Sequence, residues 1–172
     1  NEIYDSTWWG NTIDTASSIG TSTEMIQGQF NLTKLGDDLV TNGDFATDSD
    51  WNKGTGWSIG NGVATANNVP NLQRLQSSGG VSSVIGNTYK YSLEVSNVSG
   101  AYSMYIYGVY VFSSISTEGV IEGYVTATST NGTIFINGAT AQGLISATID
   151  NVSVKQVRAT TVEASKCLAD TI

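Results

Sequence analysis

From residue 39 onward, the chain is a series of short apolar segments separated by glycine and asparagine. Apolar and polar positions alternate in 89–96, with Tyr89, Tyr91, Leu93 and Val95 against Lys90, Ser92, Glu94 and Ser96. This two-residue period predicts a strand with one packed face and one solvated face. Comparable segments predict strands at 57–59, 63–66, 72–76, 102–112, 120–127, 133–137 and 144–155. Many short strands with such turns predict an antiparallel sandwich or barrel.

The flanking segments have a different pattern. Residues 1–36 show neither sustained alternation nor a helical stripe, which predicts an extended N-terminal arm. Trp8 and Trp9 are adjacent, so in an extended backbone they point to opposite sides. Either they form a subunit interface, or both pack on their own domain around a turn. In 157–172, the capping-box spacing of Thr160 and Glu163 predicts a short C-terminal helix or a linker. The strand-rich domain then covers 37–156.

Charge narrows the range of partners. Seven Lys and Arg residues against fifteen Asp and Glu residues give a net charge of -8, and the sequence contains no basic cluster. Binding to nucleic acid or to an anionic membrane is therefore disfavoured, and a divalent cation is the favoured charged ligand. No stretch approaches the roughly 18 apolar residues that a membrane helix needs.

The chain also lacks the residues that most hydrolase chemistry requires. It contains no histidine, which excludes Ser-His-Asp and Cys-His arrangements and metal sites built on imidazole. Its single cysteine, Cys167, excludes an intrachain disulfide. The acidic residues of 37–50 cluster in one turn region, whereas a glycosidase needs two carboxylates across a cleft. The sequence therefore predicts a protein that is not an enzyme.

Four ordered motifs carry a family resemblance. "LVTNGDF", "GTGWSIGNGVA", "YKYSLEVSNVSG" and "ATIDNVSVK" resemble, in that order, the carbohydrate-binding-module-like (galactose-binding-like) jelly roll. Such modules occur in glycoside hydrolases and in bacteriophage structural proteins, and "IYDSTWWGN" looks like the start of phage virion proteins. The resemblance implies an all-β fold: an antiparallel β-sandwich jelly roll with an extended N-terminal arm and a short C-terminal extension.

The resemblance also implies a calcium ion where the first and last strands meet. Alternation in "ATIDNVSV" places Asp150 on the same side as the two valines that follow, so its carboxylate is expected to point inward. Asp44 and Asn42, with neighbouring carbonyls, would complete an all-oxygen calcium shell. The alternative is that Asp150 accepts backbone N–H bonds and Asp44 caps a turn. Trp51 and Trp57 are expected to seal the sandwich near this corner.

Sugar sites of such modules depend on exposed aromatic side chains. In "YSMYIYGVYVF", alternation places Tyr105 and Tyr107 on one face, and with Tyr124 they would form an outward platform that stacks on glycan rings. A subunit interface or ordinary packing fits the same residues. The stripe lacks tryptophan, which weighs against the sugar site.

Together, these features predict a non-enzymatic phage virion structural protein, assembled in the host cytoplasm. The favoured role is a capsid decoration or accessory subunit in homo-oligomers, with the arm tied to the major capsid protein or to neighbouring copies. The alternative is a glycan-binding module of a tail fibre or adhesin. A third hypothesis is an accessory module of a secreted glycoside hydrolase.

Overall fold

A computed structural model of the chain describes residues 29–130, 132–138 and 144–163. These residues form strands and connecting loops, without a helix. The strands are β1 (Gln29–Asp38), β2 (Trp51–Lys53), β3 (Trp57–Gly60), β4 (Val63–Val69), β5 (Arg74–Ser77), β6 (Thr88–Ser99), β7 (Tyr102–Ile106), β8 (Val109–Ile115), β9 (Gly119–Thr126), β10 (Ile134–Gly138) and β11 (Ile145–Glu163).

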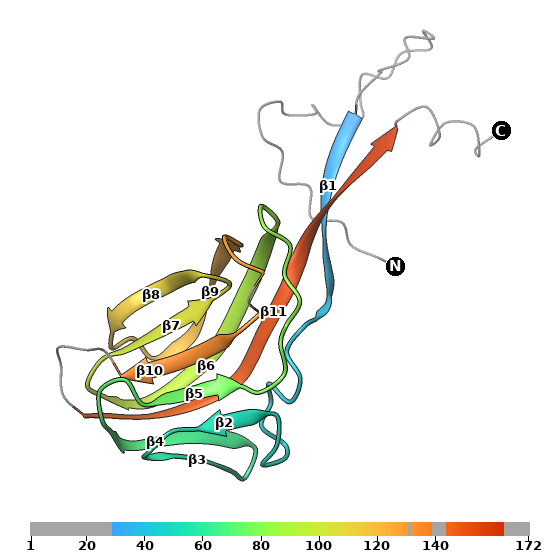
Figure 1. Cartoon of the computed structure of the whole chain (residues 1–172). Coiled ribbons are helices and arrows are strands. Elements are labelled where there is room, and N and C mark those ends of the chain that lie inside the picture. Colours follow the sequence, from blue (N-terminus) through green and yellow to red (C-terminus); the bar gives the residue numbers. More distant parts are fainter. Residues whose placement is uncertain (1–28, 131, 139–143, 164–172) are drawn as a thin grey trace, which may run out of the picture. The chain divides into compact units, whose positions relative to one another are not determined.

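The strands build two antiparallel sheets (Figure 1). The six-stranded sheet has the order β3-β4-β11-β6-β9, and β1 pairs with β11 beside this path. The five-stranded sheet has the order β2-β5-β10-β7-β8. Asn31–Thr160 form one compact unit, whose two sheets pack as a sandwich. The prediction of an all-β antiparallel sandwich is therefore confirmed.

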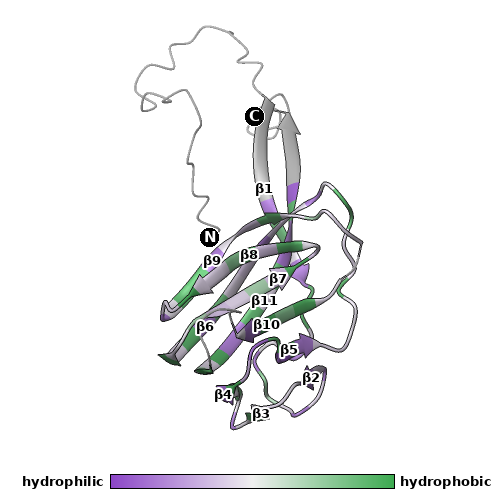
Figure 2. Cartoon of the chain, turned by 60° about the vertical axis from the view of Figure 1, so that its left-hand side comes forward, coloured by the Kyte–Doolittle hydropathy of each residue, from purple (hydrophilic) through white to green (hydrophobic). Residues whose placement is uncertain are grey.

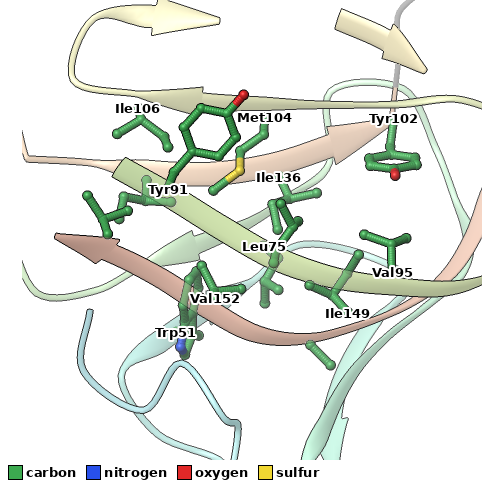
Figure 3. Close-up of a cluster of buried hydrophobic side chains, with 14 of the residues drawn as sticks. Trp51, Leu75, Tyr91, Val95, Tyr102, Met104, Ile106, Ile136, Ile149 and Val152 are labelled. Carbon is green, nitrogen blue, oxygen red and sulfur yellow. The ribbon is translucent and has the colours of Figure 1, made fainter. Parts of the chain in front are cut away.

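The core lies between the sheets and follows the predicted alternation. Side chains from the six-stranded sheet, including Tyr91 and Ile149, meet side chains from the five-stranded sheet, including Met104 and Ile136 (Figure 3). Ile149, Met104 and Ile136 are fully buried. Burying each such side chain contributes roughly 1.5–3 kcal/mol, so this alternating pattern supplies the main driving force for the fold.

One predicted strand is a hairpin. Residues 102–112 were expected to form a continuous strand, but β7 ends at Ile106 and β8 begins at Val109, which pairs with Ile106. The two turn residues, Tyr107 and Gly108, have φ of 51° and 92°. Positive φ at both central positions is the geometry that suits the twist of a two-residue hairpin. The alternation of side chains consequently stops at Tyr107.

The segments on either side of the sandwich also differ from expectation. The last residues of the predicted arm belong to β1, which is extended as predicted but pairs with β11. β11 continues to Glu163, so the predicted C-terminal helix is wrong for 157–163. The β-branched residues of this stretch favour a strand, and pairing with β1 supplies the backbone partners. The rest of the predicted helix, and Cys167, lie outside the described residues. In the part of the chain that the structure covers, no helix is long and apolar enough to cross a membrane.

Candidate functional site

The loop that follows β1 is folded around the side-chain amide of Asn42. Its Nδ2 donates to the carbonyl oxygens of Thr47 and Ser49, both at 2.8 Å, and its Oδ1 accepts from the Thr47 N–H at 3.2 Å. Asn42 has a φ of 52°, a conformation that asparagine tolerates better than most residues. The predicted calcium ligand is therefore engaged in organising its own loop.

Two tryptophans close this corner of the sandwich, as predicted. Trp51 is 4% exposed, packs on Phe45 with ring centroids 5.2 Å apart, and donates its Nε1–H to the carbonyl oxygen of Asn42 at 3.0 Å. Trp57 is 7% exposed and donates its Nε1–H to the Gln73 carbonyl at 3.5 Å. Each indole thus buries its rings and satisfies its single donor.

Asp150 does not point into the core, so its predicted orientation is wrong. Ile149 and Val152 are both buried, and the register of β11 against β6 shifts between Asp150 and Ser153. Asn151 has a φ of 50°, which accommodates the extra residue of a β-bulge. The bulge moves Asp150 to the outer side, half-buried, where its Oδ1 accepts the Asn151 N–H at 2.7 Å.

Asp44, the other predicted carboxylate, is exposed. Its Oδ1 accepts the backbone N–H of Ala46 at 3.4 Å, which is the turn-capping role considered as the alternative. Among the described residues, no group of three acidic or cysteine side chains is placed to hold a metal ion. With Asn42 engaged by its loop and Asp150 turned outward, the residues as placed do not fit a calcium shell. The calcium hypothesis therefore rests on the sequence alone.

Asp38 has a structural role that the sequence did not reveal. Its Oδ2 accepts from Ser153 Oγ at 2.5 Å, and its Oδ1 accepts the N–H groups of Val154 at 3.2 Å and of Val40 at 3.1 Å. Lys155 Nζ lies 3.9 Å from Oδ2. Asp38 thus fastens the end of β1 to β11. Its position within an acidic cluster gave no signal of this role.

The three predicted platform tyrosines are not together. Tyr105 lies on β7 in the five-stranded sheet, whereas Tyr124 lies on β9 in the six-stranded sheet. Tyr107, in the hairpin turn, is fully buried with its ring centroid 4.6 Å from that of Tyr89. Its hydroxyl has no hydrogen-bond partner among the described residues, and burial raises the pKa of Tyr107. Tyr105 and Tyr107 therefore do not share a face, because positive φ at Tyr107 ends the alternation.

A different set of aromatic residues gathers on the outer face of the five-stranded sheet. Phe135 on β10 pairs with Tyr105, and Tyr105 pairs with Tyr110 on β8. The Phe135 and Tyr105 rings are stacked at 4.6 Å with an interplanar angle of 10°, and Tyr110 meets Tyr105 edge-on at 5.2 Å. The Arg74 guanidinium lies over Phe135, 4.1 Å from its centroid. We call these four residues the aromatic face.

Asn137 on β10 adjoins the aromatic face. Its neighbour Ile136 points into the core, so Asn137 lies on the outer side of the strand, yet only 3% of it is exposed. Its Nδ2 donates to the Gly138 carbonyl at 2.8 Å, and its Oδ1 has no hydrogen-bond partner among the described residues. A buried acceptor without a donor is costly, and because the oxygen is covered it is not reachable from the surface of the sheet as placed. The sequence "IFING" reads as an apolar run with a turn, which is why neither Phe135 nor Asn137 was singled out.

The outer face of the six-stranded sheet contains a shallow groove. Its volume is about 250 Å³, and hydroxyl and amide side chains from β4, β6 and β11 line it: Thr65, Asn67, Asn97, Ser146 and Thr148. The groove offers hydrogen bonds but no ionisable side chain, so it provides no acid or base for catalysis.

Sequence comparison finds no family model and no curated protein that match this chain. The fold and the surfaces of the sandwich therefore carry the functional argument. The predicted interface residues Trp8 and Trp9 lie outside the described residues.

Proposed function

We propose that this chain is a non-enzymatic structural protein of a bacteriophage virion, acting as a capsid decoration or accessory subunit. One observation carries the proposal: β1 and β11 pair side by side, so the segments before and after the sandwich leave it as neighbouring strands. Asp38 fastens this pair with its hydrogen bonds to Ser153 and Val154. Such an arrangement suits a domain that is attached through its terminal segments and displays the sheets.

The sequence supports the same role. The resemblance of the four motifs to phage jelly-roll modules, the net charge of -8 and the absence of histidine favour a display module over an enzyme or a nucleic-acid binder. The partners proposed are the major capsid protein and neighbouring copies of this chain, and the location is the virion.

Copy number in purified particles tests this proposal. Quantitative mass spectrometry against the major shell protein should give a number comparable with the shell protein, because a shell displays its decorator at symmetry-repeated positions. A few copies per particle would indicate a tail appendage instead. Absence from the particles would overturn the virion role.

Truncation tests the attachment. Removing 1–28 keeps β1, which begins at Gln29. The shortened chain should retain its strand circular dichroism and lose assembly with particles. A second variant, the full chain with Trp8→Ala and Trp9→Ala, tests whether the two indoles are the anchors. If they are, this variant should also weaken assembly. Normal assembly of the shortened chain would contradict the role of the arm.

The aromatic face favours a second candidate, a glycan-binding module of a tail fibre or adhesin. Tyr110 is 51% exposed and meets Tyr105 edge-on, Tyr105 stacks on Phe135, and the Arg74 guanidinium lies over Phe135, so the face provides a ring surface and donors for a sugar. Tyr110→Ala and Tyr105→Ala should abolish binding on a glycan panel, and Tyr124→Ala, on the other sheet, should not. Binding that survives both of the first two changes would exclude this face.

A further inference from the structure

Four strands lie at the ends of the two described sheet orders, namely β3 and β9 in one and β2 and β8 in the other. Only one of these four is long and regular. β2 and β3 have three and four residues. β8 has seven, but its register against β7 shifts twice and Ser114 has a φ of 56°. β9 has eight residues and pairs with β6 without a shift from Thr126 to Gly119. Short strands and bulges protect a sheet edge from pairing with other chains, so among these four described ends β9 is the unprotected one; β1, which pairs with β11 beside the path, is a further edge strand.

The outer side of β9 is apolar at two positions. Val120 is 65% exposed and Tyr124 is 67% exposed, and both lie on the same face of the strand with Glu122 between them. Figure 2 shows β9 at the left-hand margin of the sandwich. A long edge strand that exposes large apolar side chains is expected to associate with another strand.

The inner side of β9 holds the strand in place. Tyr91 on β6 lies across Gly123, where an added Cβ would be 2.6 Å from the tyrosine Oη and 2.8 Å from its Cζ. An aromatic side chain over a glycine replaces the missing packing of that residue. The edge strand is therefore held in an extended form. Its backbone N–H and C=O groups that point away from β6 are in position to pair with another strand.

We propose that β9 pairs antiparallel with β9 of a second copy of this chain, about a twofold axis at Glu122. In this register Val120 of each copy lies opposite Tyr124 of the other. An axis at residue 121 would place Val120 opposite Glu122, and an axis at residue 123 would place Tyr124 opposite Glu122. Of these three axes, only the one at Glu122 pairs the two exposed apolar side chains with each other, giving two aromatic–β-branched pairs, which are among the favourable cross-strand pairs.

Charge is compatible with this register. The two copies of Glu122 lie opposite each other, but each already forms an ion pair with its own Lys90, with Nζ and Oε2 2.9 Å apart. Each of the two carboxylates that meet at the axis is thus paired with an ammonium group of its own copy.

The interface goes beyond the proposed function, because two copies would pair in solution whether or not the chain is carried on a particle. One strand pair gives a small interface, so we expect a weak dimer whose population rises with protein concentration. The pairing would join the six-stranded sheets of the two copies into one continuous sheet.

Sedimentation of the full chain over a range of concentrations tests the dimer. Tyr124→Ala removes both aromatic pairs of the twofold interface and should weaken dimerisation about tenfold. Tyr110→Ala is the matched control, because Tyr110 is also an exposed strand tyrosine but lies on the other sheet. Circular dichroism checks that both variants fold. A monomeric wild-type chain at every concentration, or equal effects of the two variants, would overturn the proposal. Failure of the glycan-binding candidate would not affect the dimer proposal, because that test concerns residues of the other sheet.

Cysteine cross-linking tests the register. In a Cys167→Ser background, Glu122→Cys places two thiols opposite each other across the axis, so mild oxidation should give a disulfide-linked dimer. Thr126→Cys is on the same strand and face, but the register pairs it with residue 118 of the other copy, so it should not cross-link. Cross-linking through Thr126→Cys instead, or equally through both, would overturn the register.

Discussion

Gly43 and Val152 are joined by a backbone hydrogen bond of 2.9 Å, from the Val152 N–H to the Gly43 carbonyl oxygen. The bond connects the "NGDF" motif of the first loop with the "IDNVSV" motif of β11 at its bulge. A Cβ at residue 43 would collide with the carbonyl oxygen of Val152. The two motifs, which are far apart in the sequence, therefore form one packing unit in the fold.

This contact predicts the effect of Gly43→Ala. The added methyl group must push β11 away from the loop, and such overpacking costs about 1–3 kcal/mol. Denaturant unfolding should show this loss in the free energy of unfolding. Gly60→Ala is the control, because an added Cβ there meets nothing within 4 Å. Equal stability of the two variants would contradict the contact.

Asn42→Asp tests the loop organised by the amide. The change keeps the shape of the side chain but removes both N–H donors and brings a carboxylate against the carbonyl oxygens of Thr47 and Ser49. Thr47 and Ser49 are exposed, so water can replace the lost donors, and each lost hydrogen bond costs about 0.5–1.5 kcal/mol, which denaturant unfolding measures. Asn61→Asp is the matched control, since Asn61 also has positive φ and precedes a glycine, but is exposed in a turn. If Asn61→Asp lowered the free energy of unfolding as much, the loss would come from the added charge and not from the broken hydrogen bonds of the loop.

Alkaline pH should destabilise the sandwich through its buried tyrosines. Burial, with a smaller effect from Glu118, raises the pKa of Tyr102 to about 12 from 10.0, and burial also raises the pKa of Tyr91. A raised pKa means that the folded state holds the proton more tightly than the unfolded state. The stabilising contribution is therefore complete below pH 10 and is lost as pH rises towards about 12.

Unfolding at a series of alkaline pH values measures this decline, and tyrosinate absorbance follows the ionisation itself. Tyr102→Phe should make the decline shallower, although it also lowers stability at neutral pH because the hydroxyl donates to the Thr117 carbonyl at 2.5 Å. The same slope in the variant and the wild type would show that Tyr102 does not carry the effect.

The calcium hypothesis has a direct measurement. If calcium binds at Asp44 and Asp150, a chelator should lower the melting temperature, because a ligand stabilises the folded state that binds it. Asp150→Asn should remove the difference between calcium and chelator. Identical melting temperatures of the wild type in the two conditions would exclude a bound calcium ion at this corner.

Strand periodicity could be predicted from sequence wherever one face of a strand is buried and the backbone is regular. β6 shows this best, because its apolar residues all face the core and its partner β9 follows it without a shift. The prediction failed where a single residue takes positive φ. Tyr107 turns the chain into a hairpin, and Asn151 creates the bulge that moves Asp150 outward. Neither residue is a glycine, so the alternating pattern gave no sign that it would be interrupted.

The candidate surfaces were harder to predict for a second reason. The aromatic face depends on which strands are neighbours: Tyr105, Phe135 and Tyr110 come from three strands, and only the sheet order brings them together. The same holds for Asp38, whose partner Ser153 is distant in sequence. Local pattern fixes which side of a strand a residue occupies, but it does not tell which residue lies beside it.

The pairing of β1 with β11 has a mechanical consequence. The Leu39 N–H donates to the Val154 carbonyl, and Gly36 lies beside Gln156, so the strands run in opposite directions and their outer ends are adjacent. In an antiparallel pair the hydrogen bonds are perpendicular to the strands. A force pulling these two ends apart would load the bonds one at a time, like a zipper, instead of shearing them together. The pair of β1 and β11 would open at low force, and the released strand segments would lengthen the chain between the pulled ends. The sheets of the sandwich would remain folded.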